Sequence, residues 1–122
     1  MRGDGTLEIT IALAQMALVR DRLDLNGEEA EAMAAQAADN GADLLVLPEL
    51  WPTGYNLERV GDHARPLGEG PFVQMGNLAQ KHGIYVTGSA AEANPHGLPF
   101  NTMALYGPTG ERLGAYRKIH LF

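Results

Sequence analysis

The sequence predicts an α/β protein with a mixed sheet packed against helices, in the order β-α-β-α-β-β-β. A short apolar run without any hydrogen-bonding side chain, residues 44–47, indicates a buried strand. Segments whose apolar residues recur at helical spacing lie before and after this run. The last third of the chain holds short β-prone runs separated by tight turns, which favours antiparallel pairing there.

The first half of the chain predicts a βαβ unit. Residues 7–15 begin with alternating apolar residues and indicate the first strand. Asn26, followed three positions later by Glu29, forms an Asn version of the capping box and should begin an alanine-rich helix. Gly41 should end this helix in the left-handed conformation. The strand at 44–47, expected to be buried on both faces, completes the unit with a right-handed crossover.

The second half predicts one more helix and three more strands. Residues 57–70 are mixed in character and are expected to be mostly loop with a possible helical turn. Pro71 stands at a typical first helical position, and Gly83 punctuates the end of the amphipathic segment between them. Strands are expected over three further segments, with turns between them that contain Gly and Pro: 84–90, 102–106 and 113–116.

Composition excludes several classes of protein. The 122 residues, 45% of them hydrophobic and 20% charged, suit a soluble globular domain. A net charge of -6 without a basic stripe argues against nucleic acid as a partner. No apolar run approaches the about 20 residues that span a bilayer, and no signal peptide is visible, so we expect a cytoplasmic protein without a membrane partner.

The sequence also argues against common cofactors. No glycine-rich dinucleotide fingerprint or P-loop follows the first predicted strand. The four histidines lack the spacing of zinc ligands, so no metal is assigned. The chain contains no cysteine, which excludes disulfides, zinc-thiolate sites and a thiol nucleophile within these residues.

Glu49 is the first candidate for a functional residue. It follows the buried strand at its carboxyl end, directly after Pro48, and open α/β sheets place ligands and catalytic groups there. The alternative is a carboxylate that simply faces solvent at the start of a loop. The stiff, aromatic and glycine-bearing turn that follows would wall a pocket and favours a site. Its possible substrate contacts, each of which could equally be a packing residue, are Leu50, Trp51 and Tyr55.

Lys118 is the second candidate. The chain has only two lysines, and Lys81 lies at a helix end, where a solvated cation complements the helix dipole. Lys118 instead precedes residues 119–122, which are apolar except for His120. This apolar flank would partly withdraw the Lys118 ammonium from water, which is unfavourable unless an anion lies nearby. Glu49 is the obvious candidate for that anion.

These motifs together resemble the nitrilase superfamily of carbon-nitrogen hydrolases. The matching segments run from the first strand to the last residue and are Leu47-Pro48-Glu49-Leu50, Thr53-Gly54-Tyr55, Asn101-Thr102, Gly110-Glu111 and Tyr116-Arg117-Lys118-Ile119-His120. The resemblance implies an α-β-β-α sandwich, no cofactor and a Glu, Lys and Cys triad. It implies Glu49 as general base and Lys118 as the electrostatic stabiliser of the tetrahedral intermediate.

The chemistry of these side chains suits those roles. A thiol attacks an amide carbon well only when a base takes its proton, and an apolar pocket should raise the pKa of Glu49 toward a useful value. A fixed ammonium beside the carbonyl oxygen stabilises the developing negative charge, an effect worth about 3 kcal/mol in a site without water.

The chain departs from the family pattern at its end. The family's nucleophilic Cys and a further Glu follow the Lys, whereas this chain stops at Phe122. Residues 1–122 are therefore expected to be the N-terminal part of an incomplete domain, inactive alone. The sheet should have an unpaired edge and an uncovered apolar face, which favours a homo-oligomer or association with the missing C-terminal half.

The expected activity of the complete protein is hydrolysis of a small carboxamide to acid and ammonia through a Cys thioester, as in the amidase-like branch. Within the superfamily, an N-carbamoyl amide hydrolase and a nitrilase are alternatives. Two other classes compete: a non-catalytic truncated or split subunit that acts in assembly, and a small α/β ligand-binding domain. The last requires Glu49 and Lys118 to lie far apart.

Overall fold

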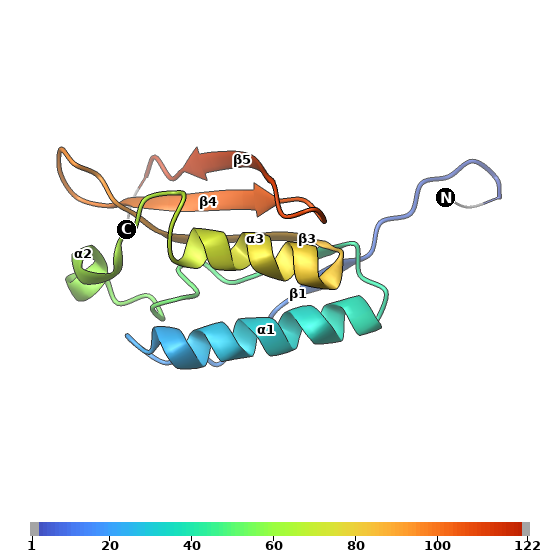
Figure 1. Ribbon diagram of the computed structural model, residues 1–122, viewed down its shortest axis with the longest axis horizontal. Coiled ribbons are helices and arrows are strands. Elements are labelled where there is room, and N and C mark those ends of the chain that lie inside the picture. Colours follow the sequence, from blue (N-terminus) through green and yellow to red (C-terminus); the bar gives the residue numbers. More distant parts are fainter. Residues whose placement is uncertain (1–2, 121–122) are drawn as a thin grey trace.

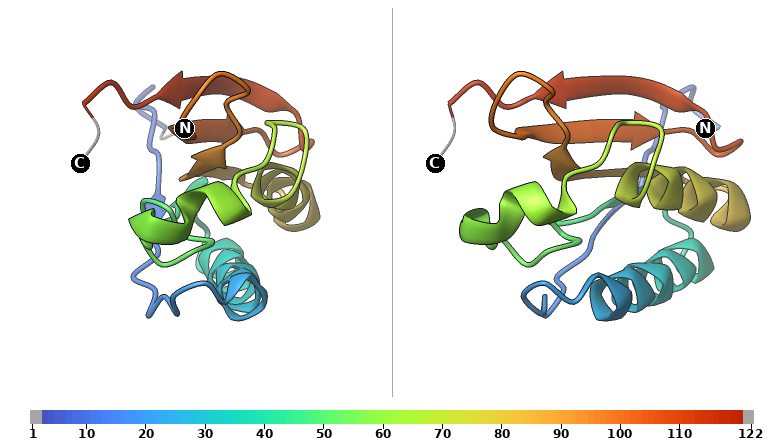
Figure 2. Two further views of the ribbon diagram at one scale, coloured as in Figure 1. Left: turned by 90° about the vertical axis from the view of Figure 1, so that its left-hand side faces the viewer. Right: turned by 60° about the vertical axis from the view of Figure 1, so that its left-hand side comes forward.

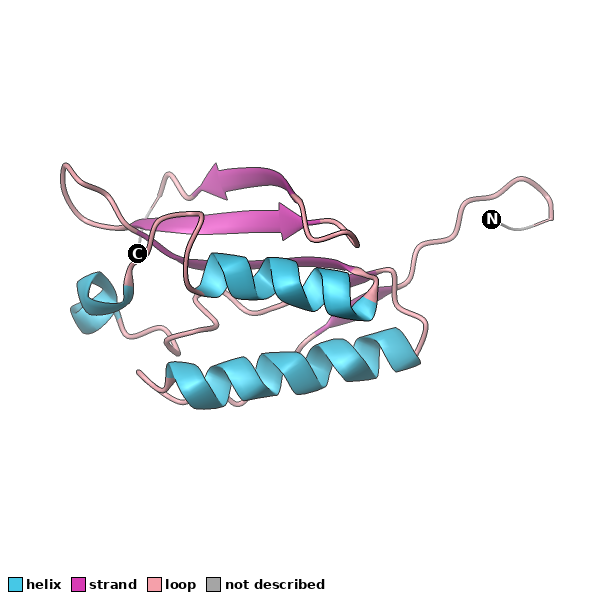
Figure 3. Cartoon of the chain, in the orientation of Figure 1, coloured by secondary structure: helices cyan, strands magenta, loops and turns pink. Residues whose placement is uncertain are grey.

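The computed structural model describes residues 3–120 and has a mixed five-stranded sheet in the order β1-β2-β3-β4-β5 (Figure 1). Strands β1 to β3 run parallel, and β3 to β5 are antiparallel, which confirms the predicted α/β class. Figure 3 shows how helices and strands alternate before the final hairpins. The elements are β1 Ile11–Leu13, α1 Leu23–Asp39, β2 Leu44–Val46, the 3-10 helix η1 Leu57–Arg59, α2 Val60–His63, α3 Pro71–His82, β3 Tyr85–Glu92, β4 Phe100–Tyr106 and β5 Arg112–Arg117.

Helices α1 and α3 lie side by side and cover one face of the sheet (Figure 2). Small residues on α1, among them Ala30 and Ala34, are fully buried and allow close approach. Helix α3 contributes Phe72 and Met75, also fully buried, each worth about 1.5–3 kcal/mol of burial. Trp51, from the loop after β2, belongs to the same core.

The opposite face of the sheet has no helix over it among the described residues. Because side chains alternate along a strand, the residues paired across this face point away from α1 and α3. Several of them are exposed or half-buried apolar residues, namely Ile11, Leu13, Leu44, Val46, Met103 and Tyr116. The expectation that 44–47 is buried on both faces is therefore wrong here, whereas the expected uncovered apolar face is present. We call it the open face.

The start of α1 differs from the prediction. The helix begins at Leu23, and Asn26 lies inside it, 1% exposed, without a capping role. Its side chain instead accepts a hydrogen bond from the Val19 N–H and donates to the carbonyls of Val19 and Pro52, each at 2.8 Å. The local sequence around Asn26 suits both a helix cap and a buried Asn that bridges two segments. The hydrogen bond from Asn26 to the Pro52 carbonyl shows that it is the second.

The other predicted ends are closer to the structure. Gly41 has φ 77° just after α1, and α3 begins at Pro71 and ends at His82, directly before Gly83, which has φ 67°. The first strand is shorter than the expected 7–15, since β2 offers it a ladder of only three residues. Residues 57–70, expected to be mostly loop with a possible helical turn, contain the short helices η1 and α2 and are otherwise loop.

The last two residues of the apolar flank after Lys118 lie outside the described residues. Within residues 3–120, no helix is long and apolar enough to cross a bilayer.

Candidate active site

The candidate site begins where β2 ends. The Leu47 N–H still bonds to the Thr87 carbonyl of β3, and Pro48 then ends the ladder because it has no N–H. Leu50 has a φ of 50°, which is unusual for a residue other than Gly. Its N–H donates to Ser89 Oγ at 2.9 Å. Glu49 is thus fixed between a proline and an anchored turn at the carboxyl end of a central strand.

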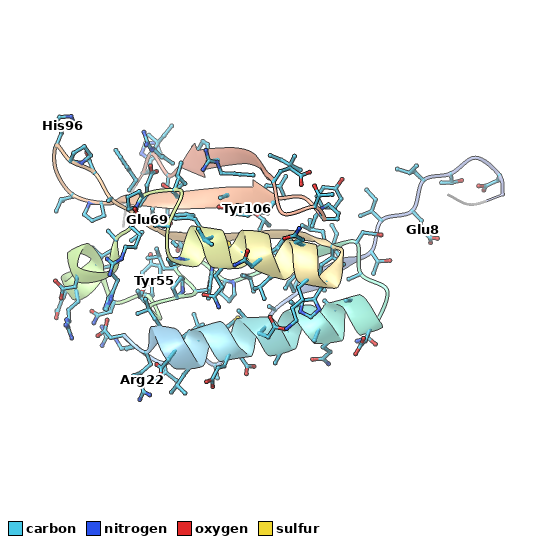
Figure 4. All side chains as sticks on the ribbon, in the orientation of Figure 1. Glu8, Arg22, Tyr55, Glu69, His96 and Tyr106 are labelled. Atoms are coloured by element: carbon cyan, nitrogen blue, oxygen red, sulfur yellow. The ribbon has the colours of Figure 1, made fainter. Side chains whose placement is uncertain are left out.

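The loop that follows is tied to the segment before α1. Asn26 holds the Pro52 carbonyl, and the Asp21 N–H donates to the Thr53 carbonyl at 3.0 Å. Gly54 has φ 71°, and a Cβ there would come within 3.2 Å of the backbone of residues 19–20, so the position requires glycine. Tyr55, labelled in Figure 4, also has a positive φ of 64°. This loop is rigid enough to hold a wall of a site.

Lys118 and Asn101 both meet the carboxylate of Glu49. Lys118 Nζ and Asn101 Nδ2 each lie 3.0 Å from the same oxygen, Oε2. The Lys118 N–H also donates to the Asn101 carbonyl at 2.9 Å, so Asn101 fixes both members of the pair. The expected meeting of Glu49 and Lys118 is observed, and the ligand-binding alternative that required them to lie apart loses its premise.

The pKa of Glu49 departs from the expected direction. The Lys118 ammonium, through its hydrogen bond and then its charge, and hydrogen bonds from Asn101 and Tyr55 hold the pKa of Glu49 below its usual value. Burial acts the other way but does not win, because the Glu49 side chain is 40% exposed. The expected rise is therefore wrong for this chain. Glu49 in turn raises the pKa of Lys118.

Two cavities lie beside Asn101 and Lys118. The first, of about 250 Å³, opens beside Glu49 and Lys118 toward the open face and is lined by Leu47, Ser89, Asn101, Met103 and Tyr116. The second, of about 220 Å³, lies on the other side of Lys118 and is mostly apolar, with walls from Leu50, Tyr55, Leu57, Val60, Leu98 and Phe100. The first cavity can therefore present both the Glu49 carboxylate and the Lys118 ammonium to a small molecule, whereas the second is lined by Lys118 but not by Glu49.

The predicted pocket residues divide into two groups. Leu50 and Tyr55 line the second cavity, although Leu50 is only 2% exposed. Trp51 lines neither cavity: it is fully buried and lies against the Gly88 backbone in the core. Trp51 is thus a core residue in this structure, and substrate contact by Leu50, Trp51 or Tyr55 stays a prediction. The catalytic roles of Glu49 and Lys118 stay predictions.

Sequence reasoning assigned no role to Asn101 or Ser89. Asn101 belongs to a quoted motif, and the antiparallel pairing of 102 with 117 would have placed it beside Lys118. No sequence pattern points to Ser89, because its hydroxyl accepts a hydrogen bond from the Leu50 N–H, 39 residues away in the chain.

The α/β fold and the contact of Glu49 with Lys118 now stand beside a comparison with protein families. Residues 10–122 match the carbon-nitrogen hydrolase family, so the chain belongs to that family. Among curated proteins, it is 39% identical over 103 residues to a nitrilase of Pyrococcus abyssi, which covers 81% of this chain and 38% of that protein. It is 33% identical over 113 residues to an omega-amidase of Danio rerio, covering 92% of this chain and 40% of the relative.

Solved structures show the same relationship. A carbon-nitrogen hydrolase superfamily protein of Xanthomonas campestris superimposes with a TM-score of 0.85 at 26% identity, covering 96% of this chain and 43% of that one. An amidase from Nesterenkonia superimposes with a TM-score of 0.81 at 25% identity, covering 93% and 44% of the two chains. The described fold is thus the N-terminal part of the nitrilase fold, and the chain spans less than half the length of these relatives.

Proposed function

We propose that residues 1–122 form the N-terminal part of a carbon-nitrogen hydrolase domain that converts a small carboxamide into an acid and ammonia. Glu49 acts as the general base and Lys118 as the oxyanion stabiliser. The nucleophilic thiol comes from residues that this chain does not contain, since it has no cysteine. The observation that carries the proposal is the contact of Glu49 with Lys118 and Asn101, at 3.0 Å each, beside a cavity that opens on the open face.

The proposed reaction has two halves. Glu49 takes the thiol proton while sulfur bonds to the amide carbon, and the carbonyl electrons move to an oxygen that faces Lys118. The intermediate collapses to a thioester, and the leaving amine takes the proton from Glu49 and departs as ammonia. Water then attacks the thioester and gives a proton to Glu49, which passes it to the departing thiolate, so that the acid leaves and the free thiol and the ionised Glu49 are restored.

The low pKa of Glu49 is consistent with an incomplete site. A carboxylate with a depressed pKa is a weak base, and the exposure of Glu49 is what lets Lys118 dominate. Covering the open face would remove water from Glu49 and raise its pKa. We therefore propose that the open face packs against the remaining C-terminal half of the domain, with self-association as the alternative.

The amide substrate is favoured by the relatives. A 2-oxoglutaramate amidase of Bacillus subtilis is 36% identical over 81 residues, and the Danio rerio omega-amidase and the Nesterenkonia amidase point the same way. The Pyrococcus abyssi nitrilase supports the nitrile alternative. The apolar second cavity suits the carbon chain of either substrate.

A chimera tests the proposal. Residues 1–122 are joined to the part of the Pyrococcus abyssi relative that follows its matched segment, and ammonia release is measured with small amides and with nitriles. Glu49→Gln and Lys118→Ala should each abolish release. Glu31→Gln and Lys81→Ala are matched controls, because Glu31 and Lys81 form the other Glu–Lys pair, at 2.6 Å between α1 and α3.

Each outcome has a clear meaning. Activity lost with the first pair of substitutions and kept with the second supports the hydrolase. Activity that survives both Glu49→Gln and Lys118→Ala removes the site assignment. A folded chimera without any ammonia release favours the non-catalytic assembly subunit.

A further inference from the structure

A second carboxylate network lies close to the site but does not touch Glu49. Glu92, the last residue of β3, is only 6% exposed. Arg117 donates to it through both Nε and Nη2, at 2.9 and 2.8 Å, and Thr102 donates its hydroxyl at 2.8 Å. One buried carboxylate therefore joins three neighbouring strands through a two-point arginine contact, which is the strong and directional form of this pair.

Strand register places this network directly behind the candidate site. Thr102 pairs with Arg117 across β4 and β5, while the next residues, Asn101 and Lys118, share a backbone hydrogen bond. Successive side chains on a strand point to opposite faces. The Glu92 network thus occupies the helix-covered face, and Lys118, one residue along from Arg117, turns toward Glu49.

The strand that leads directly to Lys118 has few other contacts to hold it. β5 is an edge strand that pairs only with β4, and every residue in it is exposed. Its pairing with β4 is irregular near Leu105 and Tyr106, at the far end from Lys118. At the near end, the Arg117 guanidinium lies over the Phe100 ring, 4.0 Å from its centroid, and forks onto Glu92. Edge strands fray unless such contacts fix them.

We propose that Glu92, Arg117 and Thr102 form a clamp that positions Lys118, so that its ammonium stays against Glu49. None of the three touches the cavity beside Glu49 and Lys118, so they are positioning residues. That Lys118 acts in catalysis rests on the proposed function, whereas the clamp itself is a property of this chain and can be tested without activity.

The test follows the titration of Lys118 by NMR of lysine side chains labelled with carbon-13. The chain has only two lysines, and the Lys81 signal, from α3, is an internal reference that should not change between variants. Contact with Glu49 raises the pKa of Lys118 above 10.5. Glu49→Gln gives the benchmark, a lower pKa of Lys118 without its anionic partner.

Arg117→Gln is the decisive variant because its two possible effects, loss of a neighbouring charge and loss of the clamp, change the pKa of Lys118 in opposite directions. Removing a neighbouring positive charge raises the pKa of Lys118 if the two interact only through space. Loss of the clamp lets Lys118 leave Glu49 and lowers that pKa toward the benchmark. Arg112→Gln removes a positive charge from the other end of β5 and is the matched control.

We expect the pKa of Lys118 to fall in Arg117→Gln and to stay level or rise in Arg112→Gln. Thr102→Val, which changes no charge and little volume, should give a smaller fall, and it decides the matter if Arg117→Gln does not fold. A pKa of Lys118 that is unchanged or higher in the folded variant overturns the clamp while leaving the proposed function intact. If Glu49→Gln itself leaves that pKa unchanged, the Glu49–Lys118 pair is absent and both proposals fall.

Discussion

Replacing Asn26 with Ala should lower the free energy of unfolding by far more than the loss of a helix cap would. In the structure, the Asn26 amide bonds to the Val19 N–H, the Val19 carbonyl and the buried Pro52 carbonyl. The Val19 carbonyl keeps a bond from the Arg22 N–H at 3.3 Å, so the change strands two backbone groups. The two groups are the Val19 N–H and the Pro52 carbonyl, and each unpaired buried group costs about 1–3 kcal/mol. Because Val19 is partly exposed and lies at the low end of this range, the total cost is about 3 kcal/mol. A lost cap costs about 1 kcal/mol.

Urea unfolding followed by fluorescence of Trp51, the single tryptophan and fully buried, measures this cost. Asn26→Asp separates the two explanations, because Asp caps helices as well as Asn does but cannot donate to the two carbonyls and brings a charge into a buried position. Asp should therefore be at least as destabilising as Ala. Asn40→Ala, at the exposed end of α1, is the control. A stable Asp variant, together with a loss of about 1 kcal/mol or less for Ala, would refute the reasoning.

Three more predictions follow from particular contacts. Arg117 holds the pKa of Glu92 below its usual 4.5 in the folded protein. The free energy of unfolding should therefore fall as the pH drops from about 4.5 through this lower folded-state pKa. When unfolding is measured against pH, this fall should be smaller in Glu92→Gln. Gly88→Ala should cost about 1–3 kcal/mol in urea unfolding, because the added Cβ would meet Leu47 Cβ at 2.9 Å and Trp51 at 3.0 Å, while Gly114→Ala, with nothing within 4 Å, should cost less. Met103→Lys on the open face should weaken self-association or binding of the C-terminal half in analytical ultracentrifugation, whereas Val73→Lys, equally 45% exposed but on α3, should not; equal effects would contradict a role for the open face.

The sequence predicted what local residues determine. Pro71, Gly41 and Gly83 set helix ends through backbone conformation, and these ends agree with the structure. The apolar run at 44–47 identified strand β2, and the position of Glu49 after it identified the candidate site. The pairing of Glu49 with Lys118 came from the family motifs and from the scarcity of lysine.

What the sequence could not predict depends on contacts between distant segments. Asn26 has a capping pattern, but its partner Pro52 is 26 residues away. Trp51 sits among candidate pocket residues and yet packs against Gly88 in the core. The pKa of Glu49 depends on how much water reaches it, which is a property of the open face. The Glu92 clamp appears only once the β4 and β5 register is known.

The pKa of the Glu49 carboxyl, measured by carbon-13 NMR in the unchanged chain and in Lys118→Gln, tests the central claim most directly. Contact with Lys118 predicts a pKa below the usual 4.5 in the unchanged chain and a clear rise toward or above it in Lys118→Gln. Lys81→Gln should leave the Glu49 titration as it is. A Glu49 pKa that is the same with and without Lys118 would mean that the carboxylate and the ammonium do not meet, and the account of the site would be contradicted.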